Sequence, residues 1–131
     1  MLRRFLTLTL VLLLGLPAAA AAITFTVTGS VVEARYSEPT TNADGSPLAD
    51  LAHTNVFFQF PGQAPVKGPN VPASALTGAG AILTTVTVPV VAGQEADVTF
   101  WATATDTSAN ESVRSTEFVK RIDRLPPGAP Q

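Results

Sequence analysis

The feature that most constrains this chain is a two-residue alternation of apolar and polar side chains. The run "ITFTVTG" (23–29) places Ile23, Phe25 and Val27 on one side and threonines on the other. A period of two, built largely from β-branched residues, predicts strands with one buried face. The alternation returns in "SVVEARYSEP" (30–39), "HTNVFFQFPG" (53–62), "AILTTVTVPVVAG" (81–93), "DVTFWATATD" (97–106) and, more weakly, "STEFVKRI" (115–122).

Turn residues separate these runs. Prolines and glycines crowd residues 61–80, which leaves room only for a short edge strand around Ala64–Lys67. No segment after residue 22 shows helical spacing over two turns. Six or seven short strands with turn signals between them predict an all-β sandwich.

The first 22 residues have a different composition. Arg3 and Arg4 lie near the start of the chain, an apolar run follows, and Pro17 precedes five alanines. These are the three parts of a secretory signal peptide, with cleavage near Ala20 or Ala22. The apolar run is shorter than the roughly 20 residues of a membrane-spanning helix.

We therefore expect a signal peptide over 1–22, one domain over 23–124 and a proline-rich tail over 125–131. The product would be secreted or periplasmic, with no stable membrane insertion after cleavage. The chain has no cysteine, so its core must hold without disulfides. Cleavage leaves six basic and ten acidic residues, a formal charge of −4, which argues against nucleic acid as a partner.

Three stretches carry a resemblance to a known family: "YSEPTTNADGSPLADLAHTNVFF" (36–58), "TFWATATDTSANES" (99–112) and "LPPGAP" (125–130). In this order they resemble bacterial and phage-type fibronectin type III domains, over essentially all of 23–131. The resemblance implies an immunoglobulin-like β-sandwich of about seven strands. Such domains are mostly non-catalytic spacers, adhesion modules or accessories to extracellular enzymes.

The chain departs from that family at three positions. Tyr36 stands where the family has a tryptophan, and Val98 where it has the tyrosine of the corner hydrogen bond. Ala109 replaces a loop glycine, so we expect no positive φ there.

The segment "NADG" (42–45) is similar to the middle of an EF-hand loop, but Thr40 and Leu51 occupy the positions of its first and last ligands. We interpret it as a turn with Gly45 at positive φ and side-chain bonds to nearby backbone. Leu48 and Leu51 are expected to fold back over the end of the sandwich.

Other polar residues predict no chemistry. His53 is the only histidine, so neither a zinc site nor a serine–histidine–acid triad is indicated. Asp97, Asp106 and Glu111 fall in a turn and a loop, where Asp106 is expected to bond backbone N–H groups. Asn110 opens a glycosylation sequon, which we interpret as incidental. We expect no enzymatic activity, no cofactor and no metal.

Two aromatic side chains are expected to point away from the core. The family topology places the strands of Phe57 and Trp101 side by side, with Thr99 and Thr103 around them. These four residues form a possible ligand face, since exposed aromatic residues mark binding sites. The alternative is a cross-strand pair that strengthens the sheet. The expected function is a module for protein–protein interaction or adhesion, or else a carbohydrate-binding module or accessory to polysaccharide-acting enzymes.

Overall fold

The computed structural model describes residues 22–131. The signal peptide expected over 1–22 lies, apart from Ala22, outside the described residues. Within the described part the chain is all-β, without a helix, as the alternation predicts. Residues 22–131 accordingly include no apolar helix of the length needed to cross a bilayer.

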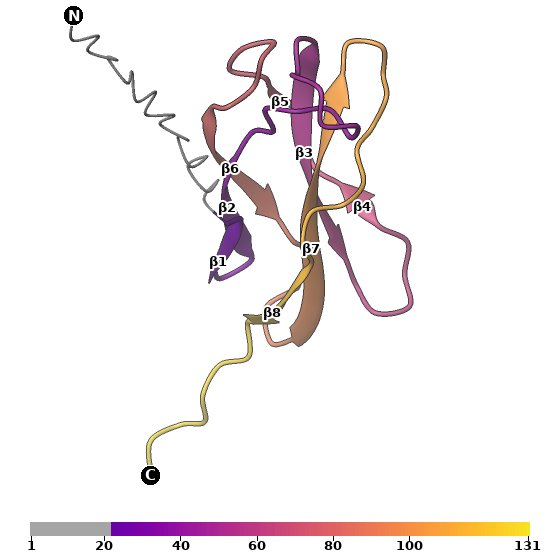
Figure 1. The fold of residues 1–131 in the computed structure, drawn as a ribbon. Helices are drawn as coiled ribbons and strands as arrows, with labels where there is room; N and C mark the ends of the chain where they lie inside the picture. The colour runs from indigo at the N-terminus through magenta and orange to yellow at the C-terminus, as the bar shows by residue number, and fades with distance from the viewer. Residues whose placement is uncertain (1–21) are drawn as a thin grey trace, which may run out of the picture.

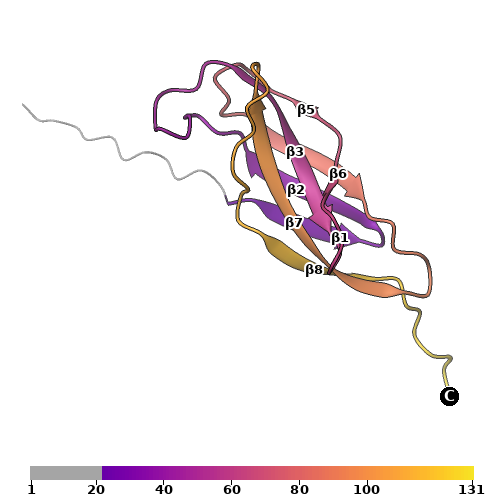
Figure 2. The same ribbon diagram turned by 90° about the vertical axis from the view of Figure 1, so that its right-hand side faces the viewer.

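Two sheets pack face to face (Figures 1 and 2). The first has the order β1-β2-β6, and the second has the order β4-β3-β7-β8, with β5 also paired to β3. All the pairings are antiparallel. The strands are β1 (Thr24–Thr28), β2 (Val31–Ser37), β3 (Leu51–Gln59), β4 (Val66–Lys67), β5 (Val71–Pro72), β6 (Ala81–Thr87), β7 (Glu95–Asp106) and β8 (Phe118–Asp123).

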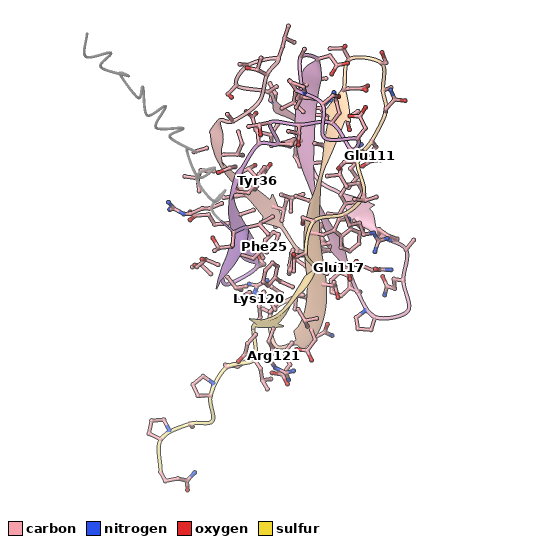
Figure 3. The ribbon with its side chains drawn as sticks, in the orientation of Figure 1. Phe25, Tyr36, Glu111, Glu117, Lys120 and Arg121 are labelled. Atoms are coloured by element: carbon pink, nitrogen blue, oxygen red, sulfur yellow. The ribbon has the colours of Figure 1, made fainter. Side chains whose placement is uncertain are left out.

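The core lies between the sheets and follows the predicted alternation. Val32 and Ala34 face inward from β2, and Val98 and Phe100 face them from β7. Phe25 lies 5.4 Å from Phe100 and 5.8 Å from Phe118, ring centroid to centroid. This aromatic contact joins β1 to β8 across the two layers, and Figure 3 shows Phe25 between them.

The connector between β2 and β3 is a tight turn with apolar anchors, as expected. Gly45 has a φ of 85°, and the Asp44 carboxylate accepts bonds from the backbone N–H and the hydroxyl of Ser46. These bonds hold the pKa of Asp44 below its usual value. Leu48 and Leu51 are both buried. The predicted turn is confirmed.

A buried carboxylate fixes the loop before β6. Glu38 follows β2 and is only 3% exposed. Its Oε1 accepts the Ser74 N–H at 2.8 Å, and its Oε2 accepts the Ser74 hydroxyl and the Gly80 N–H, the latter at 3.0 Å. A side chain at Gly80 would collide with the Ser74 side chain and with the Glu38 carboxylate. Glu38 therefore ties β2 to the 73–80 loop.

Three details differ from the expectations. The edge region contains β5 (Val71–Pro72) as well as β4 (Val66–Lys67), because Gly68 bends the chain between two short pairings with β3. The last strand begins only at Phe118, since residues 112–115 bond to β7 as an irregular segment. Ala109 has a φ of 66°, contrary to the expectation, because Asp106 fixes the turn around it.

Candidate functional site

The outer face of the five-stranded sheet carries the predicted aromatic pair. Phe57 of β3 and Trp101 of β7 are direct partners in the register. Their rings stack at 5.6 Å between centroids, with 7° between the ring planes. The Lys67 ammonium lies 5.8 Å from the Phe57 ring, and the Arg114 guanidinium 4.0 Å from the Trp101 ring. We call these four side chains the aromatic row.

The aromatic row is not an open face. Trp101 is only 1% exposed, and Phe57 is half-buried. The guanidinium of Arg114 lies over the indole, so a flat ligand such as a sugar ring has no free indole face to stack on. The expected adjacency is confirmed, whereas the expected exposure of Trp101 is wrong, because the Arg114 side chain lies over the indole. Arg114 belongs to residues 107–117, which run beside β7 and which we call the covering segment.

Hydroxyl groups hold that covering segment along the edge of β7. Ser112 and Ser115 donate their backbone N–H groups to the carbonyls of Ala104 and Ala102, at 2.8 and 2.9 Å. The N–H groups of Ala104 and Ala102 donate in turn to the Ser112 and Ser115 hydroxyls, at 3.0 and 2.9 Å. The two serines thus replace a neighbouring strand where β8 has not yet begun.

Asp106 fixes the start of the same segment. Its Oδ1 accepts the N–H groups of Ser108 and Asn110 at 2.9 Å, and its Oδ2 accepts the Asn110 side-chain amide at 2.8 Å. Chiefly the bonds from Asn110 hold the pKa of Asp106 below its ordinary value. The capping role expected for Asp106 is confirmed, and it makes the cover a fixed part of the fold.

The two threonines of the predicted ligand face have different surroundings. Thr103 is buried beneath the covering segment and donates to Glu111 at 2.7 Å. Thr99 is half-buried and lies opposite Gln59 in the register. The structure therefore gathers the four predicted residues on one sheet face, but Trp101 and Thr103 are under cover.

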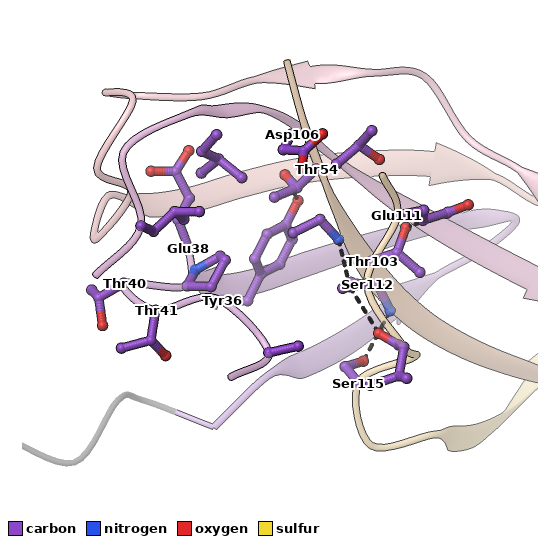
Figure 4. Close-up of a pocket in the computed structure, with 18 of the residues that line it drawn as sticks. Tyr36, Glu38, Thr40, Thr41, Thr54, Thr103, Asp106, Glu111, Ser112 and Ser115 are labelled. Atoms are coloured by element: carbon purple, nitrogen blue, oxygen red, sulfur yellow. Dashed lines mark hydrogen bonds between the residues drawn. The ribbon is translucent and has the colours of Figure 1, made fainter. Parts of the chain in front are cut away.

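A groove opens at the edge between the two sheets, where β7 runs past the end of β1 (Figure 4). Its volume is about 980 Å³. Leu48, Leu51, Ala102 and Ala104 are among its apolar lining residues. Polar groups come from the connector after β2 on one side and from residues 110–116 on the other, with Ser112 and Ser115 facing Tyr36 across it.

Two hydroxyls inside the groove bond each other, whereas the buried Thr105 hydroxyl, also in its lining, has no hydrogen-bond partner among the described residues. Tyr36 and Thr54 share a hydrogen bond of 2.7 Å that joins β2 to β3. Burial raises the pKa of the Tyr36 phenol, and the nearby Glu38 carboxylate adds to that shift. The phenol is therefore neutral at physiological pH, and it supplies the groove with an aromatic ring face and a fixed hydroxyl.

The groove was not anticipated, although "DVTFWATATD" contains its signal. Along the inward face of β7 the side chains shrink from Val98 and Phe100 to Ala102 and Ala104. Small residues at inward positions leave volume unless the opposite layer fills it. The opposite layer does not fill this volume, because β1 begins only at Thr24 and its pairing with β2 extends no farther than Arg35.

The remaining polar residues fit structural roles. His53 is half-buried on β3, paired with Thr105 and Pro72. Asp97 accepts from Arg121 at 3.1 Å, and Glu95 binds the same guanidinium, so both raise the pKa of Arg121. Within residues 22–131 no three histidine or acidic side chains gather in a way that could hold a metal ion.

Comparisons with protein-family models, with curated proteins and with solved structures found no match to this chain.

Proposed function

We propose that this protein is an exported, non-catalytic binding module of the fibronectin type III kind, and that its groove receives an extended segment of a protein partner. The two-sheet architecture agrees with such a module. The observation that carries the proposal is the groove itself, because ligand sites are concave, largely apolar and carry a few fixed polar groups.

The chemistry of the groove favours a peptide. Leu48, Leu51 and Ala102 offer an apolar floor for an aliphatic side chain. The Tyr36 and Thr54 hydroxyls bond each other, so they add shape without demanding a partner. Rigid walls lower the entropic cost of ordering a flexible segment, since only the ligand has to be immobilised.

A glycan is the second candidate ligand, and the aromatic row is the surface that would bind it. Stacked aromatic rings can bind the apolar face of a sugar, but here Arg114 would first have to leave Trp101. A glycan-binding protein of this form should therefore retain polysaccharide better when Arg114 is replaced by alanine. A peptide-binding groove predicts no such gain.

The test uses peptides selected from a random display library on the purified protein. We expect selected peptides to perturb the NMR signals of Tyr36, Thr54 and Ala104, which line the groove. Ala104→Leu should weaken their binding at least tenfold, because the added side chain occupies the floor, and a tenfold loss is about 1.4 kcal/mol.

The matched control is Ala92→Leu, which makes the same substitution at an exposed position after β6. It should leave peptide binding unchanged. Equal binding to wild type and Ala104→Leu, or perturbations confined to other surfaces, would contradict the peptide proposal.

A further inference from the structure

The four edges of the two sheets are protected to very different degrees. β8 carries charged residues along its length, and β4 and β5 are two residues each, with prolines on either side. β1 packs beside β8. β6 (Ala81–Thr87) is the outermost strand of its sheet, is seven residues long, and contains neither a charge nor a proline. Long uncharged edges are those that accept another strand.

The free hydrogen-bonding groups of β6 can be identified from its neighbours. Gly80 accepts the Glu38 N–H at 2.9 Å and Val88 donates to Ser30 at 2.8 Å, so even-numbered residues point their backbone groups toward β2. Backbone groups alternate sides along a strand in antiparallel pairing. The N–H and C=O groups of the odd-numbered residues therefore point away from β2: Ala81, Leu83, Thr85 and Thr87.

These residues are exposed. Leu83 keeps 57% of its surface accessible, although it is a large apolar side chain. In the described part of the chain no strand other than β2 pairs with β6. Among residues 22–131 nothing bonds to this edge, which is thus a free row of donors and acceptors with apolar and threonine side chains beside it.

We propose that β6 pairs antiparallel with β6 of a second copy of this chain, about a twofold axis at Thr84. In this register Leu83 lies opposite Thr85 of the second copy, and Ala81 opposite Thr87. All four are residues with outward backbone groups, so every pair of free N–H and C=O groups finds its complement. The two three-stranded sheets become one six-stranded sheet.

The side chains favour a second copy as the occupant. On the inner face Ile82 meets Val86 of the second copy, which continues the apolar layer. On the outer face Arg35 lies beside Leu83, and Glu33 beside Thr85. A row across the joined sheet therefore begins at Arg35 and ends at Glu33 of the second copy, and no like charges oppose each other.

The test compares three proteins by sedimentation velocity over a range of concentrations. Wild type should show a concentration-dependent monomer–dimer equilibrium. Leu83→Glu with Thr85→Lys should keep it, because each glutamate then faces a lysine of the second copy and also neighbours Arg35. Leu83→Glu with Thr85→Glu differs from that variant at one residue but sets glutamates opposite each other, so its dimer should be at least tenfold weaker.

Amide hydrogen exchange locates the interface. The N–H groups of Leu83 and Thr85 should gain protection as the protein concentration rises, whereas those of Thr84 and Val86 should be protected at every concentration. If the wild type stays monomeric, the proposal is wrong. The β6 edge would then be free to pair with a strand of another protein. A dimer that persists in the variant with two glutamates overturns the proposal as well, because the contact then lies elsewhere.

Discussion

A single buried carboxylate, that of Glu38, anchors the 73–80 loop in this protein. Glu38 is buried with three hydrogen-bond donors around it, from Ser74 and Gly80, and within the described residues no salt bridge involves it. Hydrogen bonds to a charged group contribute more than neutral ones, about 1.5–3 kcal/mol each. The 73–80 loop therefore depends on one residue that the alternating pattern marks only as the end of a strand.

Glu38→Ala should lower the free energy of unfolding by about 3 kcal/mol, because it removes the shared acceptor of two backbone N–H groups and one hydroxyl. Urea denaturation measures the change. Glu33→Ala is the matched control, since Glu33 is on the same strand and only forms a partly exposed ion pair with Arg35. It should change stability by no more than about 1 kcal/mol. Equal losses in the two variants would show that Glu38 is not an anchor.

Ala109 is held in a conformation that alanine disfavours. Its φ of 66° lies in the left-handed region, which costs a residue with a Cβ roughly 1–2 kcal/mol. Ala109→Gly should therefore raise the midpoint of urea unfolding, even though glycine loses more entropy on folding. Ala96→Gly, within β7, should lower it. A loss of stability in Ala109→Gly would contradict the strain observed at this position.

At the scale of elements, the segment 107–117 lines the edge of β7 and places side chains over Trp101 and Thr103 on the outer sheet face. Asp106 fixes its beginning, Ser112 and Ser115 fix its middle against β7, and Arg114 lies on the Trp101 ring. The hydrogen bonds among these contacts join residues that are 4, 8 and 13 positions apart. Beside this segment, Trp101 and Thr103 are buried on the outer face of the second sheet.

Trp101 is the only tryptophan, so its fluorescence reports on this cover directly. Arg114→Ala should shift the emission to longer wavelength and increase quenching by acrylamide, because water reaches the indole. The loss of stability should be small, about 1 kcal/mol or less for one cation–π contact. Arg35→Ala, at an exposed position on the other sheet, should leave the emission unchanged. Unaltered quenching in Arg114→Ala would mean that other residues shield the ring.

The sequence predicts this architecture well where the interactions are local. Alternation alone places Val32, Phe58 and Phe100 in the core, and "NADG" alone predicts the turn at Gly45. The cover over Trp101 could not be predicted, because residues 107–117 have no periodic pattern and their position depends on hydroxyl bonds to β7. The groove depends on where β1 begins, which no residue of β7 reveals.

At the scale of the whole molecule, the end of β8 closes the sandwich. Ile122 is fully buried, and Arg124 bonds to Gln94 and Gly93 through its backbone and to Val90 through its guanidinium. Beyond Arg124 the chain is exposed and extended, as Figure 1 shows, and Leu125 makes one bond, to Asp123. The packed part of the described chain therefore ends at Arg124.

Removing 125–131 should change the free energy of unfolding by less than about 0.5 kcal/mol, since those residues bury almost nothing. Ending the chain at Val119 instead should cost at least about 4 kcal/mol, because it deletes Ile122 and the bonds of Arg124. Urea denaturation of the two truncated proteins separates these outcomes. A large loss from the shorter deletion would place the tail within the folded unit.

The floor of the groove can change shape independently of the bonds that frame it. Ala102 and Ala104 hold the covering segment through their backbone atoms, so their methyl groups take no part in that frame. Substituting either alanine with valine, serine or leucine should therefore reshape the floor while the backbone bonds to Ser112 and Ser115 are kept. Changes at two codons would be enough to alter the shape of the groove that we propose as a binding site, which makes these positions natural targets for engineered variants.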